Sequence, residues 1–153
     1  MHIRTDDRVT AIDRTNVRLM QPTDLPYAPD VIVADLSFIS LRLILPTVRR
    51  LLAPGGEAVL LVKPQFEAGR TEVSKGKGII DNPLIWRRVL AEVSGALLER
   101  NAAIMGVMVS PITGSDGNVE FIVFGRFAGS TNAVAGHVMI ETEDLDEAFH
   151  AVT

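Results

Sequence analysis

The predicted fold depends on residues 30–63, DVIVADLSFISLRLILPTVRRLLAPGGEAVLLVK. Two short apolar runs, 31–34 and 58–62, lie on either side of a segment with helical spacing. Such runs around a helix are typical of a βαβ unit, in which the strands are parallel and the helix covers the sheet. Ligands of open parallel sheets bind outside the carboxyl ends of the strands. Asp35 and Lys63 follow these two strands, so we expect the chemistry there.

The helix between these strands is expected to span residues 41–52. Ser37 or Ser40 can cap its first turn, because a serine hydroxyl accepts a hydrogen bond from the free backbone N–H groups there. Pro46 lies inside the helical pattern and predicts either a kink or the start of the regular helix. Both alternatives keep the helix between the two strands.

The rest of the sequence predicts further elements of one α/β sheet. Asn82 followed by Pro83 is typical of a helix start, and we expect that helix to run to about Arg100. Its apolar positions recur with helical spacing, which favours Trp86 in the core over a surface role in binding. The other expected elements are strands over residues 8–12, 102–109 and 119–127, the last two paired antiparallel, and loops over residues 19–29 and 64–81.

Length and composition indicate one globular domain. The chain has 153 residues, 47% of them hydrophobic, which excludes a disordered protein. We expect residues 1–127 to form the sheet domain, and residues 128–153 to form a linker and a helix packed on it. The net charge is −4, so any contact with RNA must use a local basic patch or a domain missing from this chain.

The sequence predicts a cytoplasmic protein without a metal site. No apolar run approaches the length of about 18 residues that a membrane span needs, and the amino terminus lacks the apolar core of a signal peptide. The absence of cysteine excludes disulfides and thiolate metal sites. The three histidines lack the spacing of metal ligands.

Three ionisable residues, Asp35, Lys63 and Glu120, follow or begin predicted strands. Each has a structural alternative: Asp35 can form an Asx turn, and Lys63 can extend into solvent. Glu120 is harder to explain in this way, because an unpaired carboxylate in an apolar strand is costly. Together the three residues are candidates for one charged cluster at the sheet edge.

Three segments, VADLSFIS (33–40), LVKPQFE (61–67) and GNVE (117–120), resemble the signature segments of TlyA-type proteins. These are S-adenosylmethionine-dependent ribosomal RNA 2′-O-methyltransferases with an FtsJ-like catalytic domain, often labelled hemolysins. The resemblance covers about residues 8–127. It implies a Rossmann-like methyltransferase sheet, mostly parallel with a final antiparallel strand.

The resemblance also implies catalytic roles, because the family uses a Lys-Asp-Lys-Glu tetrad whose last three members match Asp35, Lys63 and Glu120. A ribose 2′-hydroxyl is a poor nucleophile, so methyl transfer needs alignment and removal or polarisation of its proton. Lys63 would act as a base if neutral, or stabilise the developing alkoxide if charged. Asp35 and Glu120 would orient the amine.

Cofactor contacts are implied in the same way. Thr15, Asn16 and Val17 match the place of the family's adenine contacts, and Asp35 and Leu36 are further candidates for S-adenosylmethionine binding. The amide of Asn16 suits hydrogen bonding to adenine. A simple turn around Asn16 is an equally good explanation of these residues.

The long segment 64–81 resembles the family's substrate-side loop. Arg70, Lys75 and Lys77 lie there among glycines, and their positive charges could reach RNA phosphates. A loop longer than about 12 to 15 residues without secondary structure is usually functional or mobile. Its glycines do not match a phosphate-binding P-loop.

The chain departs from the family pattern on its amino-terminal side. Two strands, a glycine-rich cofactor loop, an acidic ribose-binding residue, the first tetrad lysine and a small RNA-binding domain would precede residues 8–12 in the family. We therefore expect a methyltransferase sheet truncated at the amino terminus. The strand over residues 31–34 would then have an open apolar edge, through which two copies could pair as a homodimer.

Three functions remain open from the sequence. The first is S-adenosylmethionine-dependent 2′-O-methylation of ribosomal RNA, with the RNA or a ribosomal subunit as partner. The second is a catalytically inactive fragment or interaction module of the same fold. The third, a membrane-active hemolysin, conflicts with the lack of a spanning segment and of a strongly basic helix face.

Overall fold

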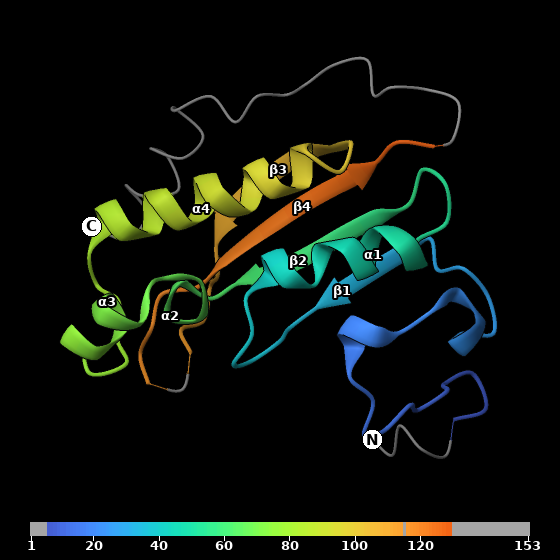
Figure 1. The fold of residues 1–153 in the computed structure, drawn as a ribbon, viewed down its shortest axis with the longest axis horizontal. Coiled ribbons are helices and arrows are strands. Elements are labelled where there is room, and N and C mark those ends of the chain that lie inside the picture. Colours follow the sequence, from blue (N-terminus) through green and yellow to red (C-terminus); the bar gives the residue numbers. More distant parts are fainter. Residues whose placement is uncertain (1–5, 115, 130–153) are drawn as a thin grey trace.

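The computed structural model describes residues 6–114 and 116–129. Within them the chain forms a four-stranded sheet with the strand order β1-β2-β4-β3 (Figure 1). β1 pairs with β2 in parallel, and β4 is antiparallel to both β2 and β3. Three strands therefore run in one direction and the last strand in the other, as predicted. The strands are β1 (Val31–Ala34), β2 (Glu57–Val62), β3 (Ala102–Val109) and β4 (Phe121–Phe127).

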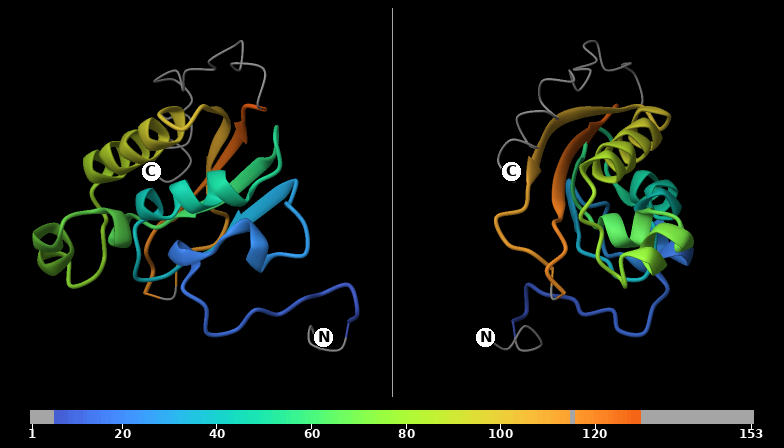
Figure 2. Two further views of the ribbon diagram at one scale, coloured as in Figure 1. Left: turned by 45° about the vertical axis from the view of Figure 1, so that its right-hand side comes forward. Right: turned by 90° about the vertical axis from the view of Figure 1, so that its left-hand side faces the viewer.

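The α-helices of this part of the chain lie on one face of the sheet (Figure 2). They are α1 (Leu45–Leu51), α2 (Pro64–Glu67), α3 (Arg70–Lys75) and α4 (Pro83–Leu98). Three 3₁₀ helices accompany them: η2 (Val17–Leu19), η3 (Pro22–Asp24) and η4 (Leu41–Leu43).

The predicted βαβ unit is confirmed, with its helix in two parts. The Ser40 hydroxyl caps η4 by accepting a hydrogen bond from the Arg42 N–H at 3.2 Å. α1 then begins at Leu45, so Pro46 lies in its first turn, where proline costs no intrahelical hydrogen bond. The left-handed conformation of Gly55 (φ 81°) lets the chain turn back into β2.

The core lies between α4, η4, α1 and the sheet. The predicted apolar face of α4 is buried, including Trp86, Val89, Leu90, Val93 and Leu97. The Trp86 indole N–H donates to the Ile80 carbonyl at 2.8 Å, so burial leaves its polar atom paired. Trp86 is therefore a core residue, as the helical spacing predicts.

The predicted strand over residues 8–12 is wrong. In the structure this segment is exposed and forms no ladder; the Val9 N–H donates to the Asp6 carbonyl in a turn instead. The Arg8 guanidinium also binds the Asp6 carboxylate at 2.6 Å. A short alternating run becomes a strand only when it pairs with another strand, and residues 8–12 pair with none of the four described strands.

The prediction of a structureless loop over residues 64–81 is also wrong. The segment contains α2 and α3, two helices too short to show an apolar period. Pro64 in the first turn helps to start α2, and the Glu72 carboxylate accepts a hydrogen bond from the Gly69 N–H at 3.0 Å to cap α3. The predicted helix within residues 128–153 lies outside the described residues, so that domain boundary remains a prediction.

The packing of α4 predicts unequal effects of two leucine truncations on the same helix. Leu90→Ala should lower the free energy of unfolding by about 2–5 kcal/mol, because it opens a cavity in the core. Leu84→Ala should change it by less than about 0.5 kcal/mol, because Leu84 is exposed. Urea denaturation followed by circular dichroism measures both values, and equal losses would contradict the packing described.

Candidate active site

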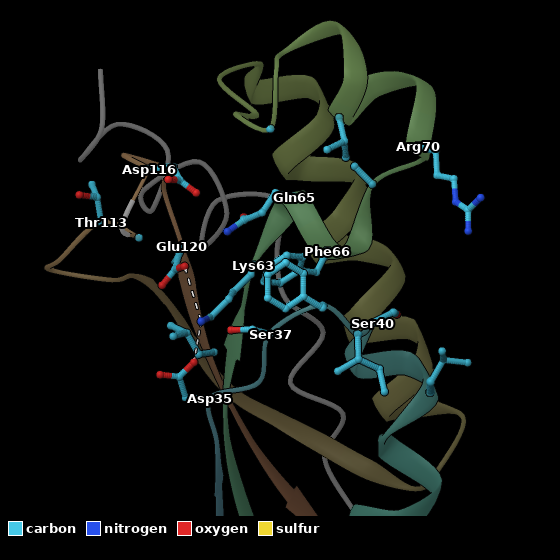
Figure 3. A pocket seen from close by; sticks show the side chains of 18 of the residues that line it. Asp35, Ser37, Ser40, Lys63, Gln65, Phe66, Arg70, Thr113, Asp116 and Glu120 are labelled. Atoms are coloured by element: carbon cyan, nitrogen blue, oxygen red, sulfur yellow. Dashed lines mark ion pairs between the residues drawn. The ribbon is translucent and has the colours of Figure 1, made fainter. Parts of the chain in front are cut away.

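Asp35, Lys63 and Glu120 meet where β1 and β2 end and β4 begins (Figure 3). Asp35 follows β1, Lys63 follows β2, and Glu120 precedes β4. Because β4 is antiparallel to β2, with Phe121 opposite Val62, its start lies beside the end of β2. The Lys63 Nζ lies 2.6 Å from Asp35 Oδ1 and 3.9 Å from Glu120 Oε1.

The three side chains differ in their access to solvent. The Glu120 side chain is 7% exposed and that of Lys63 is 13% exposed, whereas the Asp35 side chain is 67% exposed. A buried carboxylate requires a partner, and Lys63 provides the positive charge. Lys63 therefore does not extend freely into solvent, and the structure brings the three predicted residues together as one cluster.

The cluster lies in a pocket of about 1190 Å³. Its walls come from the segment that follows β1, from the turn of α2, from α3 and from the loop between β3 and β4. Besides the three charged residues, the lining includes Arg18, Phe38, Gln65, Phe66, Arg70, Ile112, Gly114 and Asp116. Polar and aromatic groups of these four segments, together with Arg18 of η2, thus line one pocket.

A buried carboxylate holds the segment after Asp35 against the turn after Lys63. Glu67 is buried in α2 and accepts hydrogen bonds from the Leu41 N–H at 2.5 Å and from the Ser40 hydroxyl at 2.6 Å. The Arg42 guanidinium adds a contact to the same carboxylate at 3.4 Å. Sequence reasoning placed Glu67 in a motif without a role; the structure gives it the role of joining two walls of the pocket.

A buried amide performs the same function on the other side of the pocket. The Asn118 side chain accepts a hydrogen bond from the Ile80 N–H at 2.9 Å and donates to the Gly78 carbonyl at 3.0 Å. Asn118 lies two residues before Glu120 in the chain. It therefore ties the loop that leads to Glu120 to the segment between α3 and α4.

Phe38 is an exposed aromatic side chain at the pocket that sequence reasoning missed. It is 91% exposed, and its backbone has φ 62°, an uncommon conformation for a bulky residue. Its ring lies 5.1 Å from the Phe66 ring, centroid to centroid, and both rings line the pocket. The signal available in the sequence is a phenylalanine four residues after the end of the predicted strand, between Ser37 and Ser40.

Two guanidinium groups lie on the rim of the pocket. Arg70 was predicted as a contact for RNA, and Arg18 is a second rim cation that the sequence analysis did not single out. Neither forms a salt bridge with another described residue. The Arg18 backbone is fixed, because its carbonyl accepts a hydrogen bond from the Thr47 hydroxyl at 3.0 Å. The other predicted RNA contacts, Lys75 and Lys77, are exposed but do not line the pocket.

α3, which carries Arg70, is tied to α4 by an ion pair. The Glu72 carboxylate lies 2.6 Å from the Arg88 guanidinium. The hydrogen bond from the Gly69 N–H, and then Arg88, hold the pKa of Glu72 below its usual value. Glu72 is therefore ionised at neutral pH and forms the ion pair that joins α3 to α4.

Most of the predicted cofactor residues lie outside the pocket lining. The Asn16 side chain caps η2 by accepting a hydrogen bond from the Arg18 N–H at 3.1 Å, and the Thr15 hydroxyl donates to the Asp13 carbonyl at 3.1 Å. Val17 and Leu36 pack against the core. Of the predicted cofactor contacts, Asp35 alone lines the pocket; the roles of the others remain predictions.

Two features are absent from residues 6–114 and 116–129. In that part of the chain, no three or more histidine, cysteine or acidic side chains are arranged to hold a metal ion. The helices there are all too short or too polar to cross a membrane.

Comparison with known proteins relates this geometry to a family. The sequence profile of the FtsJ-like methyltransferase family matches residues 1–127. YqxC of Bacillus subtilis is 44% identical over 128 residues, which cover 83% of this chain and 45% of YqxC. The 16S/23S rRNA (cytidine-2′-O)-methyltransferase TlyA of Mycobacterium tuberculosis is 38% identical over 124 residues, which cover 81% of this chain and 46% of TlyA.

A solved structure agrees with this fold. A Streptococcus thermophilus protein that carries a provisional hemolysin label superposes with a TM-score of 0.84 at 35% identity, over 98% of this chain and 54% of that one. The chain spans about half the length of the curated relatives it matches. The profile match contains all four strands and the cluster of Asp35, Lys63 and Glu120, and the chain belongs to the FtsJ-like methyltransferase family.

Proposed function

We propose that this protein transfers a methyl group from S-adenosylmethionine to a ribose 2′-hydroxyl of ribosomal RNA. The observation that supports this most directly is the Lys63 amine between the carboxylates of Asp35 and Glu120, inside a pocket at the sheet edge. Membership in a methyltransferase family supplies the reaction type. The name of the TlyA relative supports a ribosomal RNA substrate, which would place the reaction in the cytoplasm.

Lys63 has the chemistry that an alcohol nucleophile needs. As the new carbon–oxygen bond forms, the 2′-hydroxyl loses its proton and its oxygen gains negative charge. Lys63 accepts that proton if its amine starts neutral, or stabilises the oxygen if it starts charged. Asp35 and Glu120 hold the amine from two sides, so its direction is set before the substrate arrives.

The charges of the cluster suit the cofactor. S-adenosylmethionine supplies an electrophilic methyl group on a positively charged sulfonium. The cluster contains two carboxylates and one amine, so acidic groups outnumber basic ones, which favours a cationic ligand nearby. Contacts of Thr15, Asn16, Val17 and Leu36 with the cofactor are part of the proposal and rest on the family resemblance.

The rim of the pocket suits RNA. Arg18 and Arg70 line the pocket, and their guanidinium groups can bind phosphates of the RNA; Lys75 and Lys77 can extend this contact along the strand. The exposed Phe38 ring offers a surface on which a base can stack. These groups form a local cationic rim on a chain whose net charge is −4.

The free edge of β1 is a candidate interface between two copies of the chain. Val33 is 74% exposed, and β1 pairs only with β2 among the described strands. An apolar edge with unpaired backbone groups favours pairing with another strand. We include a homodimer through this edge in the proposal.

Replacement of Lys63 tests the catalytic assignment. In the intact gene product, Lys63→Ala should lower the rate of methyl transfer by about 10²–10⁴-fold, because proton transfer or charge stabilisation is lost. Binding of S-adenosylmethionine, measured by calorimetric titration, should be nearly unchanged. The readout of activity is transfer of a labelled methyl group to ribosomal RNA.

Arg126→Ala is the matched control for a lost positive charge, since Arg126 pairs with Glu57 at the far end of β4. A Lys63→Ala protein with wild-type activity would remove Lys63 from the mechanism. A wild-type protein that binds no S-adenosylmethionine would instead favour an interaction module of this fold.

Replacement of Arg70 tests the RNA-binding rim. Arg70→Ala should weaken RNA binding and lower the slope of log affinity against log salt by about 1, the effect of one lost phosphate contact. The maximal rate at saturating RNA should stay near that of the wild type. Filter binding at several salt concentrations measures the slope. If Arg126→Ala gave the same change, the effect would come from net charge and not from the rim.

The dimer is tested by charge placed on the β1 edge. Val33→Lys should convert a concentration-dependent dimer into a monomer in sedimentation velocity, because a lysine there opposes strand pairing. Met108→Lys, at an exposed position on the opposite edge strand β3, should leave the dimer intact. A wild-type protein that sediments as a monomer at all concentrations would refute the dimer.

A further inference from the structure

We propose that Gly114 is a positioning residue that sets where the Glu120 carboxylate lies beside Lys63. A Cβ atom on residue 114 would lie 2.8 Å from Glu120 Oε1 and 3.4 Å from its Cδ. The first distance is shorter than real Cβ atoms show, and the second lies at the lower limit of ordinary van der Waals contact. The carboxylate therefore occupies space that a side chain at position 114 would take. The inference rests on the proposed function, in which Glu120 orients the Lys63 amine.

The Gly114 backbone forms a fixed wall behind the carboxylate. Its N–H donates to the Asn118 carbonyl at 2.9 Å, and its carbonyl accepts a hydrogen bond from the Gly117 N–H at 2.9 Å. Asn118 is itself buried and bonded to Gly78 and Ile80. The wall is thus attached to the body of the domain and cannot easily recede from Glu120.

The backbone conformation of Gly114 does not itself require glycine. Gly117 has φ 86°, where a side chain would strain the backbone, but Gly114 is not among the described glycines with positive φ. At Gly56 and Gly76 an added Cβ would meet backbone atoms within 3.0 Å. At Gly114 the two closest atoms belong to the side chain of Glu120, so the space serves the carboxylate.

This difference predicts how an alanine at position 114 would act. The end of a glutamate side chain can rotate away, whereas backbone atoms cannot, so the fold should tolerate the extra methyl group. The rotation would carry the carboxylate from its place 3.9 Å from the Lys63 amine. Misplacement of about 1 Å at a catalytic group can cost on the order of 10²-fold in rate.

The test compares Gly114→Ala with Gly95→Ala in the intact gene product. Gly114→Ala should lower kcat for RNA methylation by about 10–100-fold, with the affinity for S-adenosylmethionine within about twofold of the wild type. Gly95→Ala should leave both unchanged, because a Cβ at that position in α4 would meet no atom within 4 Å apart from its chain neighbours and the helix's own backbone. Unchanged kcat in Gly114→Ala would overturn the proposal.

A second readout does not depend on activity. In protein labelled with ¹³C at glutamate Cδ, the Glu120 resonance is assigned from its loss in Glu120→Gln. It should shift in Gly114→Ala and stay in place in Gly95→Ala. An unshifted resonance would overturn the positioning role. A shifted resonance would support that role even in a protein that methylates no RNA. A wild-type protein without methylation activity would refute only the proposed function.

Thermal unfolding covers the case in which Gly114→Ala is poorly folded. If position 114 acts through the Glu120 side chain, Gly114→Ala should lower Tm in the wild-type background but not in a protein that already carries Glu120→Ala. An equal drop in both backgrounds would show a merely structural role for Gly114 and overturn the proposal.

Discussion

The Lys63 amine lies between two carboxylates because three strands meet at one sheet edge. β1 and β2 are parallel, which brings Asp35 and Lys63 to neighbouring strand ends, and β4 enters between β2 and β3 in the opposite direction, which places Glu120 beside them. Glu120 is buried, so the Lys63 charge supports both the fold and the site. A different pairing of these strands would leave a buried carboxylate without its cation.

Two buried polar side chains extend this arrangement from the strand ends to the walls of the pocket. Glu67 joins the turn after Lys63 to the segment after Asp35, and Asn118 joins the loop before Glu120 to the segment before α4. Buried polar groups with all their partners in place rigidify a structure, because moving them would leave those partners unsatisfied. The pocket is therefore largely preformed, which favours catalysis by orientation.

The charges at the pocket are separated by position. The centre carries the carboxylates of Asp35 and Glu120 around one amine, and the rim carries Arg18 and Arg70. In the proposed reaction the cationic cofactor and the polyanionic substrate have opposite electrostatic requirements, and such a separation would suit both.

The sequence by itself determined the βαβ unit, the α4 helix, the antiparallel pair at the end of the sheet and the cluster of Asp35, Lys63 and Glu120. Apolar periodicity and strand-end residues are local signals, and a parallel sheet brings such ends together. The tertiary structure decided the rest. Residues 8–12 form no strand because they pair with none of the described strands, and α2 and α3 are too short to show an apolar period. The exposure of Phe38 and the closeness of Gly114 to Glu120 depend on contacts between segments distant in the chain, which no local pattern contains.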